Sequence, residues 1–94
     1  MAWIHIHHKV QDYNGWRQVW ERTAEYKRHQ GWKRFRLFQV TGDRTDLIVM
    51  EQFGTLEQAH AYAVSEVLQK SLAQAGLTAP AEILVLDGLE EGPA

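Results

Sequence analysis

Residues 4–16, which read IHIHHKVQDYNGW, decide the fold because a strand in this stretch runs directly into a helix. Successive side chains of a strand point to opposite faces. One face therefore carries Ile4, Ile6, His8 and Val10, and the other carries Trp3, His5, His7 and Lys9. Asp12 can cap a helix by accepting hydrogen bonds from the free amides of its first turn. The stretch predicts a strand over residues 3–10 and a helix that begins after Asp12.

The helix is predicted to run to Gly31. Its apolar face consists of residues at helical spacing, which are Trp16, Val19, Trp20 and Thr23. Either Tyr26 or Lys27 continues that face. Charged side chains between residues 17 and 28 form a solvated opposite face.

The remaining chain predicts a hairpin, a second helix and a last strand. Strands over residues 32–40 and 46–53 flank the turn-forming loop 41–45. Thr55 and Gln58 form a capping box that opens a helix reaching Gly76. Its expected apolar stripes are Ala59, Ala63 and Val67, with Val64, Leu68 and Leu72 beside them. A strand over residues 82–86 and a loose tail over residues 90–94 complete one domain of residues 1–94.

This order, βαββαβ, predicts an α+β fold of the ferredoxin-like type. Four antiparallel strands would form one sheet with two helices on one face. Strands 32–40, 46–53 and 82–86 are apolar on both faces, although helices can cover only one. An open apolar face of that size is unusual for a soluble monomer. The pattern therefore predicts a homodimer that packs through the sheet face.

Composition excludes several classes of function. The formal net charge of -2 gives no basic footprint for nucleic acid. The chain has no cysteine, so disulfides, thiol nucleophiles and cysteine-bound zinc are excluded. No apolar run is long enough to span a membrane. The N-terminus also lacks the apolar core of a signal peptide, so we expect a cytoplasmic protein.

Nearly the whole chain resembles the dimeric α+β barrel superfamily, and within it the small antibiotic biosynthesis monooxygenase-like proteins. The similarity rests on fold-bearing positions. They are His8-Lys9-Val10-x-Asp12-Tyr13-x-x-Trp16, Glu51-Gln52-Phe53, Thr55-Leu56-Glu57-Gln58-Ala59, Ser65-x-x-Leu68, and Ala75-Gly76-Leu77 before Pro80.

The resemblance implies two subunits whose sheets pack face to face. It also implies a range of activities, including cofactor-free oxidation of aromatic polyketides, heme degradation and polyketide cyclisation. Alignment on Ser65 and Leu68 places Tyr62 where the heme-degrading relatives have a pocket Trp. The same alignment places Leu72 where they have the heme-ligating His. A leucine cannot ligate iron, which argues against heme. We expect a protein without a cofactor.

His8 and Tyr62 are the candidate catalytic residues. His8 shares its strand face with Ile4 and Ile6, so it should point toward the helices and the pocket. Tyr62 could donate a hydrogen bond to a substrate oxygen. The structural alternatives are a satisfied histidine at a strand end and an aromatic core residue. Trp16 is a core residue in the simplest interpretation and a wall of the binding pocket in the functional one.

His5, His7 and Arg36 are candidate binding residues on the other face. His5 and His7 could reach a common metal ion, but a lone HxH pattern is unspecific and predicts no metal site. They could instead be polar members of the subunit interface, bonded to water or to carboxylates across it. Arg36 could bind a substrate anion or form an intersubunit salt bridge.

Two functions follow as hypotheses. The first is a cofactor-independent monooxygenase or cyclase-like enzyme, in which His8 removes a phenolic proton from a small aromatic or polyketide-type substrate. The second is a non-catalytic dimeric domain with a ligand-binding or regulatory role.

Overall fold

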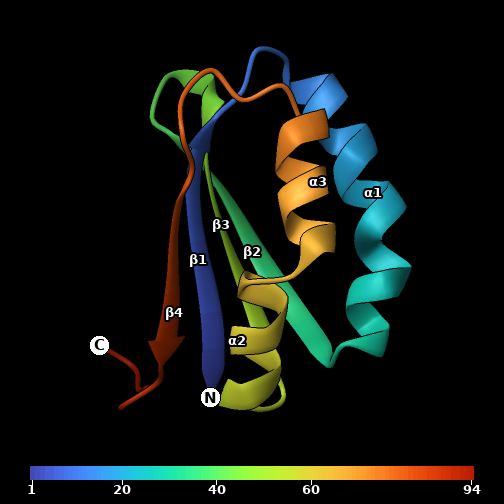
Figure 1. Cartoon of the computed structure of the whole chain (residues 1–94). Helices are drawn as coiled ribbons and strands as arrows, with labels where there is room; N and C mark the ends of the chain where they lie inside the picture. The colour runs from blue at the N-terminus through green and yellow to red at the C-terminus, as the bar shows by residue number, and fades with distance from the viewer.

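The fold, seen in a computed structural model that describes residues 1–94, is a four-stranded sheet with helices on one side (Figure 1). The elements in chain order are β1 (Ala2–Lys9), α1 (Tyr13–His29), β2 (Trp32–Val40), β3 (Asp43–Phe53), α2 (Leu56–Ala63), α3 (Glu66–Gln74) and β4 (Glu82–Asp87). The sheet is antiparallel throughout, in the order β2-β3-β1-β4. This arrangement confirms the predicted α+β fold class.

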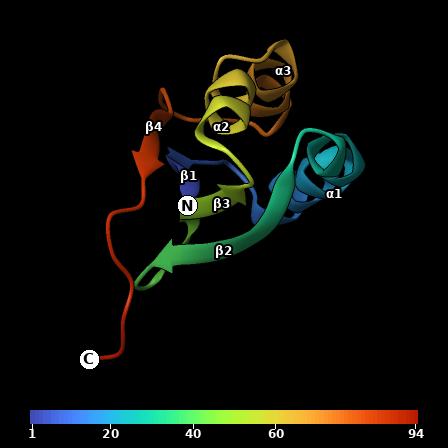
Figure 2. The same cartoon turned by 90° about the horizontal axis from the view of Figure 1, so that it is seen from below.

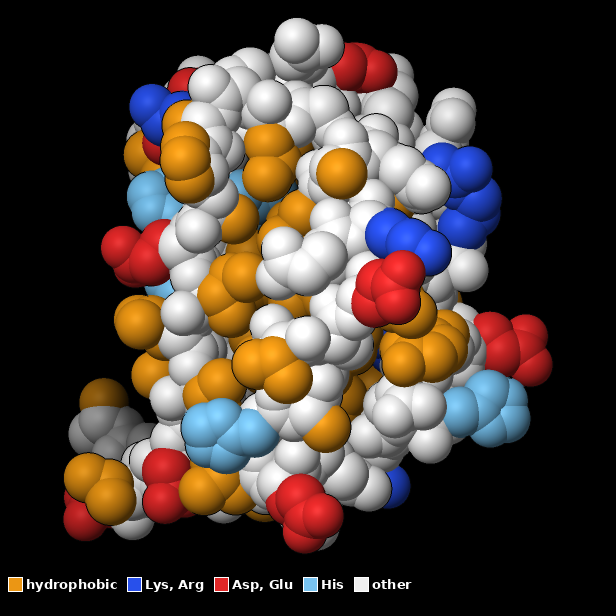
Figure 3. Space-filling view, viewed as in Figure 1, with side chains coloured by type: hydrophobic (Ala, Val, Ile, Leu, Met, Phe, Trp, Pro, Cys, Tyr) orange, Lys and Arg blue, Asp and Glu red, His pale blue; other side chains and the backbone are white.

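Strand β1 lies in the middle of the sheet and separates two different environments. Ile4, Ile6 and His8 face the helices and are at most 3% exposed. Across β1, the paired residues of β3 on the same face are Glu51, Val49 and Leu47. Figure 2 shows that all the helices lie on one side of the sheet and that the other face carries none. In Figure 3 hydrophobic side chains gather along the seam between sheet and helices, whereas most charged ones lie toward the rim.

Helix α1 begins as predicted, because the Asp12 side chain accepts a hydrogen bond from the Gly15 amide at 2.8 Å. The sequence left open whether Tyr26 or Lys27 continues the apolar face of α1, and their burial decides between them. Lys27 is 1% exposed, whereas Tyr26 is 37% exposed, so Lys27 continues the inward face. Gly31 follows the helix with a φ of 96°, a left-handed conformation that glycine adopts without strain.

The second helical segment differs from its prediction. One helix was expected up to Gly76, but it is divided into α2 and α3. The Ser65 hydroxyl donates to the Tyr62 carbonyl at 2.7 Å and accepts from the Leu68 amide at 3.1 Å. Ser65 thus ends one helix and caps the next. The expectation that Val64 lies on an apolar stripe is wrong, since Val64 at this break is 80% exposed.

Three strand boundaries also differ slightly from prediction. Strand β3 begins at Asp43 rather than at residue 46, which shortens the loop of the hairpin. β1 covers Ala2–Lys9, and Val10 forms only an isolated bridge with Leu77. β4 ends at Asp87, and residues 88–94 are exposed and form no regular element. None of the helices combines the length and the apolar character that a membrane span requires.

Candidate functional site

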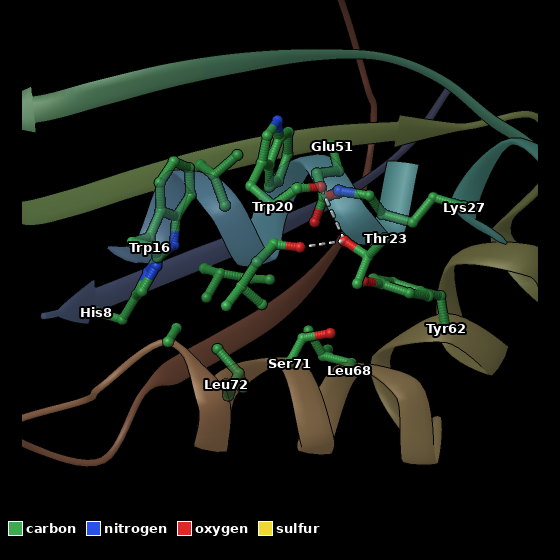
Figure 4. Close-up of a pocket in the computed structure, with 14 residues that line it drawn as sticks. His8, Trp16, Trp20, Thr23, Lys27, Glu51, Tyr62, Leu68, Ser71 and Leu72 are labelled. Atoms are coloured by element: carbon green, nitrogen blue, oxygen red, sulfur yellow. Dashed lines mark hydrogen bonds and ion pairs between the residues drawn. The ribbon is translucent and has the colours of Figure 1, made fainter. Parts of the chain in front are cut away.

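The candidate site is a cavity between the sheet, α1 and the α2–α3 layer (Figure 4). Its volume is about 40 Å³, room for roughly three water molecules. This is well below the roughly 150 Å³ that holds a benzene molecule in an engineered protein cavity. The lining side chains are Ile6, His8, Val49 and Glu51 from the sheet, Trp16, Val19, Trp20, Thr23 and Lys27 from α1, and Tyr62, Leu68, Ser71, Leu72 and Ala75 from the other wall.

His8 stands at one end of the cavity. It is 3% exposed, and its Nδ1 atom is buried without a hydrogen-bond partner of good geometry. Burial is the main influence on this ring and lowers the pKa of His8, although the nearby Ile6 carbonyl partly opposes the shift. His8 is therefore held as a neutral imidazole with an available nitrogen.

Two tryptophans of α1 stack on each other in the lining of the cavity. The rings of Trp16 and Trp20 are stacked, with centroids 5.3 Å apart and an interplanar angle of 19°. Trp16 also contacts His8, at a centroid distance of 5.9 Å. The four-residue spacing brings both indoles onto one helix face. Both indoles add apolar surface to the lining of the cavity.

The other end of the cavity holds a buried ion pair. Lys27 Nζ donates to Glu51 Oε1 at 3.0 Å, and both side chains are 1% exposed. The same ammonium lies 3.2 Å from the ring centroid of Trp20 and 4.5 Å from that of Trp32, so two cation–π contacts stabilise its charge.

Burial acts on both members of this pair. It lowers the pKa of Lys27 and raises the pKa of Glu51, and in each case the charge of the partner opposes the shift. Removing two charges from water is costly, and an apolar pair of similar volume often stabilises a core equally well. Because stability alone does not require the Lys27–Glu51 pair, the pair is a candidate for binding a ligand.

Tyr62 lies at the same end as the ion pair. It is 3% exposed and packs against Phe53 with ring centroids 5.4 Å apart. Burial, and then the negative charge of Glu51, raise the pKa of Tyr62. Its hydroxyl consequently stays protonated at ordinary pH and can act as a hydrogen-bond donor.

The structure brings three of the predicted site residues together and separates the others from them. His8, Tyr62 and Trp16 all line the cavity. His5, His7 and Arg36 belong to the open face of the sheet, where they pair in register with Met50 or Ile48 of β3. The roles predicted for these residues stay predictions.

On the open face, the histidines do not form a cluster with other potential metal ligands. His7 Nε2 is 2.7 Å from Asp46 Oδ1, a partner within the same sheet rather than across an interface. His5 Nδ1 is buried and has no partner. No group of three or more His, Cys, Asp or Glu side chains converges in the chain.

Sequence reasoning did not single out the Lys27–Glu51 pair. Two signals could have found it. Lys27 follows Trp16, Trp20 and Thr23 on one helix face, and Glu51 alternates with the core residues Val49 and Phe53 of β3. A charge on each of two apolar faces that pack together predicts a buried pair.

The architecture is shared with solved structures, although the sequence alone identifies no relative. The sequence matches no protein-family model, and no curated protein is significantly similar to it. Among solved structures, SnoaB of Streptomyces nogalater, described as a cofactor-independent oxygenase, has a TM-score of 0.74 at 14% identity, over 99% of this chain and 96% of that one. The fold is that of the antibiotic biosynthesis monooxygenases.

Two proteins provisionally assigned to the antibiotic biosynthesis monooxygenases are equally similar. The protein from Deinococcus radiodurans has a TM-score of 0.76 at 14% identity and covers 100% of this chain and 98% of its own. The protein from Nitrosomonas europaea has a TM-score of 0.72 at 18% identity and covers 96% of this chain and 100% of its own. At such identities the likeness establishes the architecture of the monooxygenases and not an activity.

Proposed function

We propose that this chain is a cofactor-independent monooxygenase or cyclase-like enzyme that acts on a small, electron-rich aromatic or polyketide-type substrate. The observation that carries the proposal is the cavity itself. Two stacked tryptophans line it, and it places a neutral histidine with an unpaired buried nitrogen among apolar side chains. SnoaB, which shares the fold, is described as a cofactor-independent oxygenase.

In the proposed reaction, neutral His8 accepts a proton from a phenolic hydroxyl of the substrate. The O–H bond breaks, and its electron pair stays on the substrate. Tyr62 orients the substrate by donating a hydrogen bond to a second oxygen. The electron-rich anion gives one electron to dioxygen, and recombination forms a carbon–oxygen bond. Protonated His8 returns its proton to the peroxide, which loses water and leaves a carbonyl on the substrate.

A substrate ring is larger than the cavity, so the proposal requires α1 and α3 to move apart during binding. The cavity lies between these helices, and the side chains that they contribute from opposite sides, such as Trp20 and Leu72, are only partly buried. Opening the wall there would leave the strand pairing of the sheet intact.

Oxygen uptake with a panel of phenols and hydroquinones tests the proposal. We expect His8→Ala to lower kcat/KM by about 100-fold or more, the usual size of a general-base contribution. Tyr62→Phe should lower it by about tenfold, because one hydrogen bond is lost. His60→Ala, at an exposed position of α2, is the matched control and should have no effect. If no panel member is consumed by the wild-type protein, the enzymatic proposal is wrong.

The pH profile offers an independent check. The base must be neutral to act, and burial lowers the pKa of His8 from its usual 6.5. Activity should therefore fall only at a pH below 6.5, as His8 gains a proton. The acidic limb of kcat/KM against pH would report this pKa. A limb above 6.5 would point to a different base.

The small volume of the cavity favours a second candidate function, a non-catalytic dimeric domain with a ligand-binding or regulatory role. About 40 Å³ is less than any aromatic substrate needs. A non-catalytic domain would consume no oxygen with any ligand that it binds, in the wild type or in His8→Ala.

For both functions we infer a homodimer that forms through the open face of the sheet. Large apolar side chains remain exposed there, including Phe38 at 47%, Leu84 at 46% and Val40 at 40%. Phe38 and Val40 lie on β2 and Leu84 lies on β4, the two edge strands of the sheet. A second copy of this face would remove them from water.

A further inference from the structure

The polar groups of the cavity gather at its two ends. His8 stands opposite Leu47 of β3, and Glu51 lies four residues further along the same strand. At a rise of about 3.3 Å per residue, the two backbone positions are roughly 13 Å apart. Lys27 and Tyr62 accompany Glu51, and Figure 4 shows His8 at the opposite end from these groups.

The two hydroxyls in the middle of the cavity have no free donor for a ligand. Each O–H group donates within its own helix. The Thr23 hydroxyl donates to the Trp20 carbonyl at 3.0 Å, and the Ser71 hydroxyl donates to the Val67 carbonyl at 2.8 Å. The other side chains between the ends are aliphatic or aromatic. A complementary ligand is therefore mainly apolar in its middle and polar at both ends.

The end of the cavity with the ion pair has hydrogen-bonding groups that are still available to an acidic oxygen of a ligand. Lys27 bonds to Oε1 of Glu51, which leaves Oε2 to accept a hydrogen bond. The indoles of Trp20 and Trp32 fix the ammonium in place beside the cavity. Tyr62 adds a donor hydroxyl. A carboxylate acceptor, an ammonium and a phenol at one point can bind a hydroxyl group or its anion.

We propose that Lys27 and Glu51 form a second recognition point for an acidic oxygen, so that the cavity selects flat aromatic molecules with one acidic oxygen at each end. This inference rests on the proposed function, because it takes the same cavity as the substrate site and His8 as its other end. It identifies the substrate class as an elongated dihydroxy aromatic.

Proton transfer at this end leaves the net charge of the cavity unchanged. When a ligand hydroxyl gives its proton to Glu51, the O–H bond of the ligand breaks and a new O–H bond forms on the carboxylate. The ligand oxygen keeps the electron pair and becomes the partner of the Lys27 ammonium. One ion pair replaces another, so no additional charge is buried.

Two naphthols are suitable probes, 2,6-dihydroxynaphthalene with a hydroxyl at each end and 2-naphthol with one. We expect the dihydroxy probe to bind the wild-type protein about tenfold more tightly or better, since a hydrogen bond to a charged group contributes that much. Isothermal titration or naphthol fluorescence measures both dissociation constants without any turnover.

The double variant Lys27→Met/Glu51→Leu removes the recognition point and keeps the volume of the core. In it the preference for the dihydroxy probe should fall to within about twofold. Glu21→Gln, an exposed charge change on the same helix, should keep the full preference. If the double variant does not fold, Glu51→Gln replaces it. Because Glu51→Gln removes the proton acceptor, the bound dihydroxy probe can lose its proton only to solvent, so its naphtholate absorption should appear at higher pH than in the wild type.

Equal affinity of the two probes in the wild type would overturn the inference, as would an unchanged preference in the double variant or an unshifted ionisation in Glu51→Gln. Oxygen uptake separates this result from the proposed function. Turnover of phenols with equal probe affinities would sustain the enzyme and reject the second recognition point. A Lys27-dependent preference without oxygen uptake would do the opposite. Failure of both probes to bind would reject the second recognition point, and the oxygen-uptake panel would still decide the enzymatic proposal.

Discussion

Replacing Lys27 by methionine should lower the free energy of unfolding by about 3–5 kcal/mol at neutral pH, the usual cost of removing one partner from a buried ion pair. The cost arises because Glu51, which is 1% exposed, keeps a charge that no longer has a partner. The variant should also show a marked pH dependence. Burial raises the pKa of Glu51 from its usual 4.5, and loss of the ammonium raises it further.

The sign of that dependence follows from proton binding. In Lys27→Met the folded state holds the Glu51 proton to a higher pH than the unfolded chain does. Its stability is therefore greatest below the unfolded pKa of about 4.5 and falls as the pH rises through the folded pKa. Urea unfolding of the variant and of the wild type at several pH values measures the difference in their free energies of unfolding at each pH.

The double variant Lys27→Met/Glu51→Leu is the matched comparison for stability. It leaves no unpaired charge, so we expect its stability to be within about 1 kcal/mol of wild type or higher. If it loses as much stability as the single variant, packing of the two side chains rather than their charge holds α1 against the sheet. In that case the pair has a structural role, and its burial no longer supports a role in ligand binding.

The substitution Phe38→Glu should convert the proposed homodimer into a monomer. Phe38 is 47% exposed on the open face, so the isolated subunit should tolerate glutamate with little loss of stability. In the dimer the change would remove an aromatic contact and bury a carboxylate without a partner. We expect the dimer dissociation constant to rise by about 100-fold or more, as for hot-spot residues. Sedimentation velocity over a range of protein concentrations measures it.

Leu56→Glu provides the control for that experiment. Leu56 is also an exposed large hydrophobic residue, at 38%, but it lies at the start of α2 on the helical side of the sheet. A negative charge in the first turn of a helix is favourable. This variant should remain dimeric. If Leu56→Glu dissociates and Phe38→Glu does not, subunits associate through the helical side instead.

Strand alternation and helical spacing predicted most of the architecture from the sequence. Alternation placed His8 on the helix face and His5 and His7 on the open one, and the register of β1 with β3 agrees. Capping chemistry predicted the starts of α1 and α2 at Asp12 and Thr55. These features depend on neighbours within a few residues, which a sequence displays directly.

Features that depend on packing between distant segments were harder to predict. The break at Ser65 is decided by two bonds of one hydroxyl, and an alanine-rich context favoured a continuous helix. The Lys27–Glu51 pair joins residues 24 positions apart in the chain. The volume of the cavity depends on how closely α1 and α3 approach each other, and the sequence gives no measure of that distance.

The central position of β1 restricts how this protein can change during evolution. A one-residue insertion or deletion before Ile6 would turn Ile6 and every following side chain of the strand to the opposite face. Because His7 and His8 are adjacent, a shift by one position would still present a histidine to the cavity. Ile6, however, would leave the core for the open face. We therefore expect homologous sequences to vary in residue identity along β1 but not in its length, since packing of the core rather than the presence of a histidine sets that length.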